Sequence, residues 1–96
     1  MKIYLTALIK SKADSTEEMK GYLLELLAAS TQETACLQYE LHQSTEDESQ
    51  FIFHEIWASQ EGLDLHNVQP HIQHFSQQAG PIMDGPVKII KTTKIR

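Results

Sequence analysis

The segment from Phe51 to Phe75 constrains the fold of this chain most strongly. It opens with Phe51 to Trp57, a run of aromatic and β-branched side chains typical of a β-strand. Both alternating faces of this strand are largely apolar, so we expect it to be covered on both sides. Ser59 is suited to cap a short helix through Asn67, and Pro70 to open a second helix through Ala79. The segment holds the single tryptophan and four of the five histidines, so we expect the chemistry of the chain to lie in or beside it.

The rest of the chain predicts one more helix and three more strands. Residues 2–10 alternate in the manner of a central strand, again with two mostly apolar faces. Ser15 and Glu18 match a capping box, and the apolar positions that follow have the spacing of one buried helical face, fading near Glu33. Residues 37–43 predict a strand whose apolar face carries Leu37, Tyr39 and Leu41, and residues 87–94 predict the last strand.

The resulting order is strand, helix, strand, strand, helix pair, strand, within a single domain over residues 1–96. This order predicts an α+β fold of the ferredoxin-like βαββαβ type, a four-stranded antiparallel sheet with helices on one face. The other face of such a sheet is bare in a monomer. Because the first and third strands are apolar on both faces, we expect a homodimer in which sheet packs against sheet.

Composition narrows the classes of partner and location. A net charge of −5 and a pI near 5.4 argue against nucleic acid or an anionic membrane as the partner. No apolar run approaches the roughly 20 residues of a spanning helix, and residues 1–10 lack the pattern of a signal peptide. The single cysteine, Cys36, cannot form an internal disulfide. We therefore expect a cytoplasmic protein that binds neither membrane nor nucleic acid.

Three motifs stand out by their order and spacing: Glu33-x-x-Cys36-Leu37-x-Tyr39-x-Leu41, Phe53-x-Glu55-x-Trp57 and His66-x-x-x-Pro70-His71-x-x-x-Phe75. Together they resemble the antibiotic biosynthesis monooxygenase (ABM) domain family, and its quinol monooxygenases in particular. The resemblance implies a dimeric α/β barrel with a pocket between each sheet and its helices. Members include cofactor-independent oxygenases of quinols and hydroxyanthrones, a haem-degrading branch and an isomerase of a phosphorylated quorum-sensing signal.

The chain departs from the family pattern at three places. Ala35 stands where most members have glycine, which indicates a slightly different turn. His54 stands where tyrosine is frequent. The first strand contains no asparagine, the residue that the haem-degrading branch uses there, so we do not expect haem chemistry.

Trp57, His66 and His71 are the candidate catalytic residues. Trp57 is either a core residue or an indole that stacks on a flat substrate and donates a hydrogen bond to it. His66 either caps the end of its helix or removes a phenolic proton as a general base. His71 lies in the first turn of the next helix, where the dipole favours a neutral imidazole that accepts a proton or orients substrate.

Tyr39, Phe53, Glu55 and Phe75 are the candidate substrate-binding residues. For Tyr39, a structural hydrogen bond and a hydroxyl in the pocket are both open. Glu55 shares a strand face with Trp57, so we expect it to be buried and anchored by the backbone or by a cation rather than to act as a base.

We expect no metal and no other cofactor. His66, His71 and His74 match no standard metal motif, and no carboxylate accompanies them at ligand spacing in the sequence. Cys36 reads as a small buried hydrophobe rather than a nucleophile.

The sequence thus favours an oxygenase that oxidises a small quinone-like or other electron-rich aromatic with O₂. Two alternatives stay open on the same scaffold. One is an isomerase of a small phosphorylated metabolite, for which Lys88 or Lys91 would supply a cation. The other is a binding module that holds a ligand without turnover.

Overall fold

The elements of the computed structural model, which describes residues 1–96, follow the predicted order with one short 3₁₀ helix added. They are β1 (Ile3–Lys10), α1 (Thr16–Ser30), β2 (Cys36–Gln43), β3 (Gln50–Trp57), α2 (Gln60–Asn67), α3 (Pro70–Ala79), η1 (Gly80–Ile82) and β4 (Lys88–Thr92). No helix among them is both long and apolar enough to cross a lipid bilayer.

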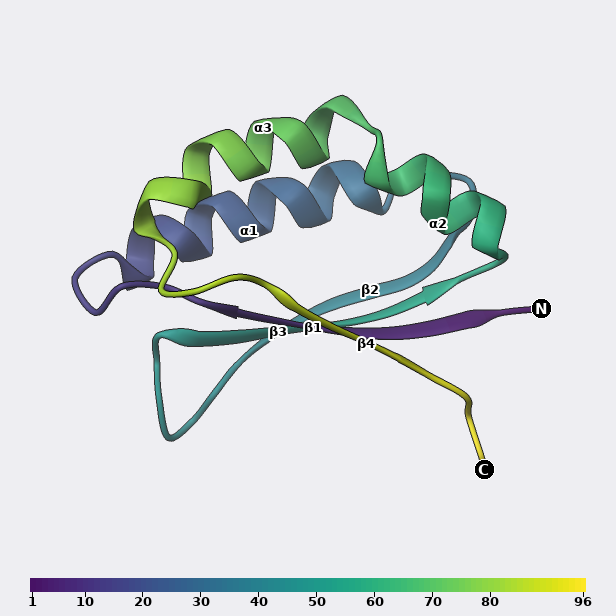
Figure 1. Ribbon diagram of the computed structural model, residues 1–96, viewed down its shortest axis with the longest axis horizontal. Coiled ribbons are helices and arrows are strands. Elements are labelled where there is room, and N and C mark those ends of the chain that lie inside the picture. Colours follow the sequence, from purple (N-terminus) through teal and green to yellow (C-terminus); the bar gives the residue numbers. More distant parts are fainter.

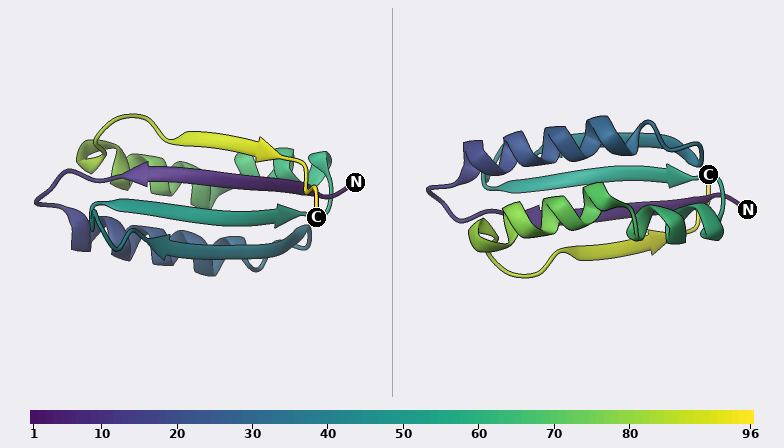
Figure 2. Two further views of the ribbon diagram at one scale, coloured as in Figure 1. Left: turned by 90° about the horizontal axis from the view of Figure 1, so that it is seen from below. Right: turned by 90° about the horizontal axis from the view of Figure 1, so that it is seen from above.

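The four strands form one antiparallel sheet in the order β2-β3-β1-β4, which confirms the ferredoxin-like prediction. Figure 1 shows α1, α2 and α3 together on one side of this sheet. Seen from the opposite side, in the left view of Figure 2, no helix covers the strands, and only the C-terminal tail crosses their ends. The molecule therefore has two layers, and its core lies between the helices and one sheet face.

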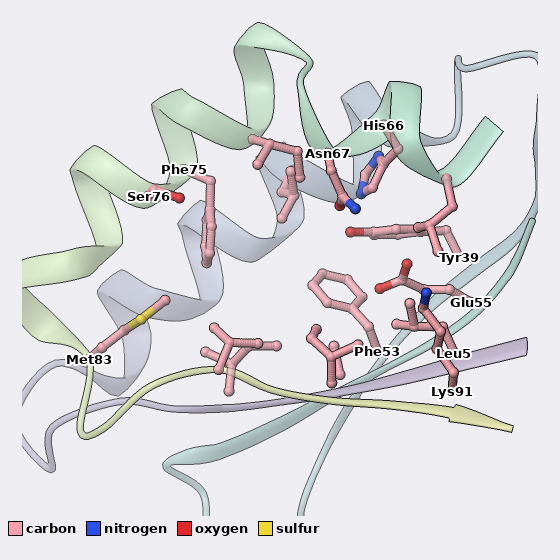
Figure 3. Close-up of a pocket in the computed structure, with 17 residues that line it drawn as sticks. Leu5, Tyr39, Phe53, Glu55, His66, Asn67, Phe75, Ser76, Met83 and Lys91 are labelled. Atoms are coloured by element: carbon pink, nitrogen blue, oxygen red, sulfur yellow. The ribbon is translucent and has the colours of Figure 1, made fainter. Parts of the chain in front are cut away.

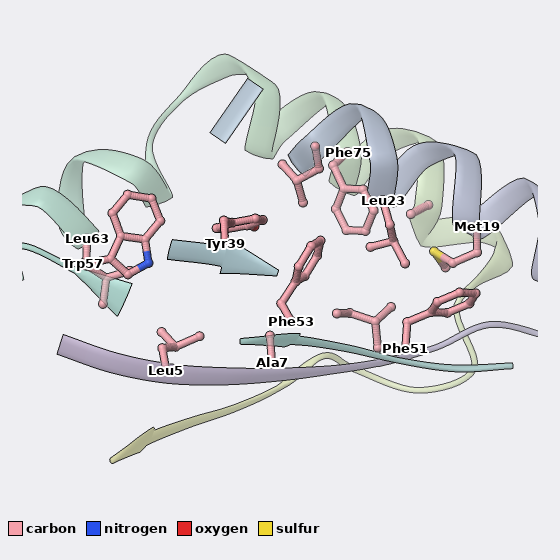
Figure 4. Packing of buried hydrophobic residues seen from close by; sticks show 13 residues of the cluster. Leu5, Ala7, Met19, Leu23, Tyr39, Phe51, Phe53, Trp57, Leu63 and Phe75 are labelled. Atoms are coloured by element: carbon pink, nitrogen blue, oxygen red, sulfur yellow. The ribbon is translucent and has the colours of Figure 1, made fainter. Parts of the chain in front are cut away.

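The core is built by the two central strands and the long helix. Phe51, Phe53 and Trp57 point from β3 toward the helices. Figure 4 shows Phe51 and Phe53 on the side of Met19 and Leu23 of α1, and Trp57 at the other end beside Leu63 of α2. All six side chains are essentially inaccessible to solvent. At roughly 1.5–3 kcal/mol for each large apolar side chain, this burial holds β3 and α1 as the rigid frame of the molecule.

The bare face of the sheet carries two apolar pairs on its central strands, one on each side of the polar pair Thr6 and His54. Tyr4 on β1 lies opposite Ile56 on β3, and Leu8 on β1 lies opposite Ile52. All four side chains are only half-buried in the single chain. This agrees with the pattern from which the homodimer was inferred, and the homodimer itself stays a prediction.

Local signals predicted the starts of α1, α2 and α3 correctly, with Ser15 at the N-cap of α1, but the side-chain bonds expected at Ser15 do not form. The Ser59 hydroxyl accepts a hydrogen bond from the Gly62 amide at 3.1 Å, and Pro70 opens α3. The capping box at α1 was wrong. The Ser15 side chain makes no capping bond and donates to Asp14 instead, while Glu18 accepts a hydrogen bond from the Tyr22 hydroxyl.

A β-bulge between Cys36 and Gln38 corrects the predicted face of β2. The extra residue shifts the alternation by one position, so Leu37 leaves the core and is 51 % exposed. From Gln38 onward the predicted alternation holds, and Tyr39 points inward opposite Glu55. The bulge therefore sets which β2 side chains reach the space beneath α2.

Candidate functional site

An apolar cavity of about 240 Å³ lies between the sheet and the helices. We call it the inner cavity; Figure 3 shows the side chains around it. Hydrophobic side chains make up 12 of its 17 lining residues, among them Tyr39, Phe53 and Phe75. The other five lining residues are Glu55, His66, Asn67, Ser76 and Lys91. A largely apolar hollow with a few convergent polar groups is the usual form of a small-molecule site.

A cluster of Glu33, His66 and His71 lies above this cavity. The Glu33 Oε2 atom is 2.6 Å from Nδ1 of His66 and 2.8 Å from Nε2 of His71. The three residues come from the turn after α1, from the last turn of α2 and from the first turn of α3. Their side chains are 12 %, 4 % and 22 % exposed, respectively. One carboxylate oxygen thus ties three segments together in a mostly buried setting.

The contact with Glu33 fixes the orientation of the His66 ring. A carboxylate can only accept hydrogen bonds, so Nδ1 of His66 must donate and carry the proton. In the neutral ring this leaves Nε2 with its lone pair. Figure 3 shows the ring directed from α2 toward the Tyr39 hydroxyl and the inner cavity. Burial lowers the pKa of His66, and the hydrogen bond to Glu33 opposes this shift.

Trp57 supports this arrangement from behind rather than lining the cavity. Its side chain is fully buried and is absent from the cavity wall. The indole N–H donates to Oε1 of Glu55 at 2.9 Å, and the indole packs on the His66 ring with centroids 4.3 Å apart. The expectation of an indole that stacks on substrate and donates to it therefore differs from the structure, where the N–H is occupied. Trp57 orients His66 and Glu55.

Two acidic groups on the cavity wall keep their protons more firmly than usual. Burial raises the pKa of the Tyr39 hydroxyl, so it remains a hydrogen-bond donor across the physiological range. Burial also raises the pKa of Glu55 to about 7, against a smaller lowering by the Trp57 hydrogen bond. No cation lies within salt-bridge distance of Glu55, so its anchor is an indole and not the cation or backbone group expected.

A second, more polar hollow of about 620 Å³ lies on the outer side of the cluster. We call it the outer hollow. Its wall includes Glu33 and His71 but not His66, whereas the inner cavity includes His66 but neither of the other two. Gln32, Thr34 and Gln69 also line it. The cluster therefore separates two spaces, with one imidazole facing each.

The structure corrects the sequence-based view of the histidines as ligands. Glu33 supplies the carboxylate that the sequence spacing did not reveal, and ligand atoms of Glu33, His66 and His71 all lie within 4.8 Å of one another. His74 is exposed and lies outside this group. These three are the residues of the chain that could hold a metal ion together.

Five of the seven residues singled out from the sequence line one cavity, namely Tyr39, Phe53, Glu55, His66 and Phe75. Sequence reasoning assigned no role to Glu33, Asn67 or Ser76. Glu33 carried a signal, since it opens the first of the three motifs. Asn67 and Ser76 carried none, because they are isolated polar residues on exposed helical positions.

This fold and cavity define a small α+β protein with an apolar cavity between a sheet and its helices. Residues 2–78 match the family described as antibiotic biosynthesis monooxygenase, so the chain belongs to that family. The motifs built around Glu33, Glu55 and His66 thus predicted the family correctly.

The relatives agree with this assignment. The chain is 28 % identical over 90 residues to the Bacillus subtilis (strain 168) protein named "Putative monooxygenase YcnE", covering 94 % of this chain and 95 % of that one. It is 26 % identical over 81 residues to "Uncharacterized protein sll1783" from Synechocystis sp., covering 84 % of this chain but only 55 % of that protein. The chain therefore spans little more than half the length of the Synechocystis relative.

Solved structures share the fold over nearly the whole chain. PA3566 from Pseudomonas aeruginosa superimposes with a TM-score of 0.93 at 29 % identity, covering 99 % of this chain and 95 % of that one. Rv0793 from Mycobacterium tuberculosis gives a TM-score of 0.92 at 20 % identity, covering 100 % and 97 %, which shows the fold alone.

Proposed function

We propose that the protein is a cofactor-independent oxygenase that oxidises an electron-rich aromatic of the quinol type with O₂ in the inner cavity. The observation that carries the proposal is the setting of the His66 side chain. This side chain is a buried imidazole whose Nδ1 is held by Glu33 at 2.6 Å and whose ring faces an apolar cavity. A base held by a carboxylate on one nitrogen and open on the other has the arrangement of the His–Asp pair in hydrolases.

The size of the cavity favours a small substrate. A cavity of about 150 Å³ accommodates benzene, so about 240 Å³ suits one or two fused rings better than three. Phe53 and Phe75 give the space flat apolar walls, as a planar ring requires. We therefore place a naphthoquinol-sized compound ahead of a hydroxyanthrone.

The chemistry follows from the groups around the cavity. His66 Nε2 accepts the proton of a phenolic O–H, and the ionised Glu33 stabilises the imidazolium that forms. The Tyr39 hydroxyl, held protonated by its raised pKa, donates to the new phenolate oxygen. The apolar wall excludes water and leaves an electron-rich anion beside O₂. Two electrons and two protons passing to O₂ give a quinone and hydrogen peroxide, whereas oxygen insertion places one atom in the product and the other in water.

Lys91 supports a second candidate function. It lines the inner cavity, and Lys88 does not, so Lys91 is the cation available to a phosphorylated metabolite in the isomerase alternative. A single lysine facing a wall with 12 hydrophobic residues and the carboxyl of Glu55 is a weak site for a phosphate dianion. The quinol-type substrate is therefore the first choice.

Oxygen uptake by the metal-stripped protein with menadiol and with a hydroxyanthrone tests the proposal, after subtraction of autoxidation. His66→Ala should lower the enzymatic rate by about 10²-fold or more, the usual contribution of a general base. Glu33→Gln should also lower it, because the amide cannot stabilise an imidazolium as a carboxylate does. Labelling with ¹⁸O₂ then distinguishes insertion from dehydrogenation.

His74→Asn is the matched control. His74 is an exposed histidine on the same helix as His71, so this variant should keep the wild-type rate. A rate equal to autoxidation in every protein would overturn the oxygenase. Binding of menadione with no turnover would then favour the binding module, and binding of a sugar phosphate that is lost in Lys91→Ala would favour the isomerase.

A further inference from the structure

The Glu33–His66–His71 cluster has the composition and convergence of a metal site. We infer that these three side chains form a site for a divalent transition-metal ion of the zinc class. They supply two imidazole nitrogens and one carboxylate oxygen, all within 4.8 Å of one another. The inference concerns binding by the resting protein and holds whether or not the oxygenase reaction does.

The directions of the two imidazoles carry the argument. Nδ1 of His66 and Nε2 of His71 both aim at one point, now held by Oε2 of Glu33, at 2.6 and 2.8 Å. In a tetrahedral zinc site with bonds of about 2.0–2.1 Å, neighbouring ligand atoms lie about 3.3 Å apart. Each of the two contacts therefore needs to lengthen by only roughly 0.5–0.7 Å to admit an ion. A rotation of the Glu33 side chain provides this movement. The two imidazole nitrogens, which lie within 4.8 Å of each other, must also approach the same spacing of about 3.3 Å.

The ligand types select the ion. Imidazole suits zinc, copper, cobalt and nickel, whereas calcium and magnesium prefer all-oxygen sites. Two histidines and one glutamate leave a fourth position for water, as in zinc sites that keep an open position. The outer hollow, which Glu33 and His71 line, supplies that water, and Gln32, Thr34 and Gln69 on its wall can hydrogen-bond to it.

Burial and packing of the ligands make this cluster a better metal site than a fully exposed cluster would be. His66 is packed between the rings of Trp57 and Tyr39, with centroid distances of 4.3 and 5.7 Å, so its Nδ1 is held in place before any ion binds. With both imidazoles neutral the three ligands carry one negative charge, which a dication more than neutralises. Binding at Nδ1 of His66 and Nε2 of His71 moves the N–H proton of each neutral ring to its other nitrogen, so the two rings release no net proton.

The site has a consequence for the inner cavity. When Nδ1 of His66 bonds a metal, its remaining proton resides on Nε2, the nitrogen that faces the cavity. The imidazole then donates a hydrogen bond to a ligand there instead of accepting a proton. This step rests on the proposed function, and it makes the bound ion an inhibitor of the oxygenase rather than its cofactor.

The test titrates Zn²⁺ and Co²⁺ into metal-stripped protein, with calorimetry for affinity and stoichiometry and Co²⁺ absorption for geometry. We expect one ion per chain and the visible Co²⁺ bands of a four-coordinate site. Glu33→Gln and His71→Asn should weaken binding at least ~tenfold, and His74→Asn should bind as wild type does. Absence of saturable binding, or equal affinity in all four proteins, would overturn the site.

A second measurement covers the case in which a variant fails to fold. Sub-stoichiometric Co²⁺ added to the wild-type protein should broaden the ring signals of His66 and His71 before those of His42, His54 and His74. Broadening of the exposed histidines first would overturn the site. Oxygen uptake with and without Zn²⁺ is recorded separately, so a protein that binds zinc but oxidises nothing leaves the metal site standing and removes the oxygenase.

Discussion

Glu55→Gln should make the protein more stable at alkaline pH. It should also remove most of the pH dependence of the unfolding free energy that the Glu55 carboxyl causes. Glu55 is 6 % exposed, has no cationic partner, and its pKa is raised by burial from 4.5 to about 7. Because the folded carboxyl holds its proton more tightly than the unfolded one, its contribution to stability is full below about pH 4.5. The contribution falls as pH rises toward 7 and then levels off. Glutamine stays neutral throughout and keeps an oxygen for the Trp57 N–H.

The magnitude follows from the shift. The difference of 7 from 4.5 corresponds to 2.5 pKa units, or about 3.4 kcal/mol at about 1.4 kcal/mol per unit. Since the unfolded carboxyl is already partly ionised at pH 5, about 2.5 kcal/mol of this remains between pH 5 and pH 8.5. Relative to wild type, Glu55→Gln should therefore gain about 2–3 kcal/mol over that interval.

Urea unfolding at pH 5 and pH 8.5 measures this difference, with the fluorescence of Trp57 as the signal and protein concentration held fixed in case the chain associates. Glu48→Gln, which removes an exposed carboxylate, is the control and should leave the pH dependence near that of wild type. A Glu55→Gln protein whose stability changes with pH as steeply as wild type would refute the burial argument.

Three further predictions test the packing, the thiol and the bare sheet face. A Cβ at Gly62 would clash with the Cβ of Ala35, so Gly62→Ala should lose about 1–3 kcal/mol of unfolding free energy in urea. Ala35→Gly in the same protein should restore most of this loss, and equal stability of Gly62→Ala and wild type would contradict the clash. Burial raises the pKa of Cys36 to about 11 from 9.0, so at pH 8 its alkylation should be about a hundredfold slower than that of an ordinary thiol, and a rate like that of a model peptide would count against it. Light scattering should give twice 10.9 kDa for the wild-type chain and a smaller mass for Ile52→Lys on the bare face, whereas a monomeric wild type would remove the homodimer.

The features predicted correctly from the sequence are those that local or periodic signals specify, such as helix caps and the alternation of strand residues. Ser59 caps α2 through an amide three residues away, and the alternation of β3 placed Phe53, Glu55 and Trp57 on one face. The contacts of Glu33 could not be found in this way, because they are long-range. Glu33 is separated from His66 by 33 positions along the chain and from His71 by 38. Its position depends on how the turn after α1 packs against α2 and α3.

Two side-chain positions could not be predicted from the local sequence. The capping box at Ser15 failed because neighbouring Asp14 and Tyr22 offered the two side chains other partners. The sequence left Trp57 open as a core residue or a substrate contact, because strand alternation gives the face of a residue but not its depth. In the structure the indole lies behind His66 and Glu55, which take the positions nearest the cavity.

The inner cavity has one wall of buried core residues and one wall from β4, where substitutions cost little folding stability. β4 is an edge strand paired with β1 alone, and all five of its residues are exposed, yet Ile89 and Lys91 line the cavity. Substitutions at exposed positions usually change stability by no more than about 0.5 kcal/mol, whereas truncating Phe53 would cost about 3–5 kcal/mol. Substitutions in β4 can therefore reshape this cavity at little cost to folding, while His66 and the aromatic walls stay fixed by the core.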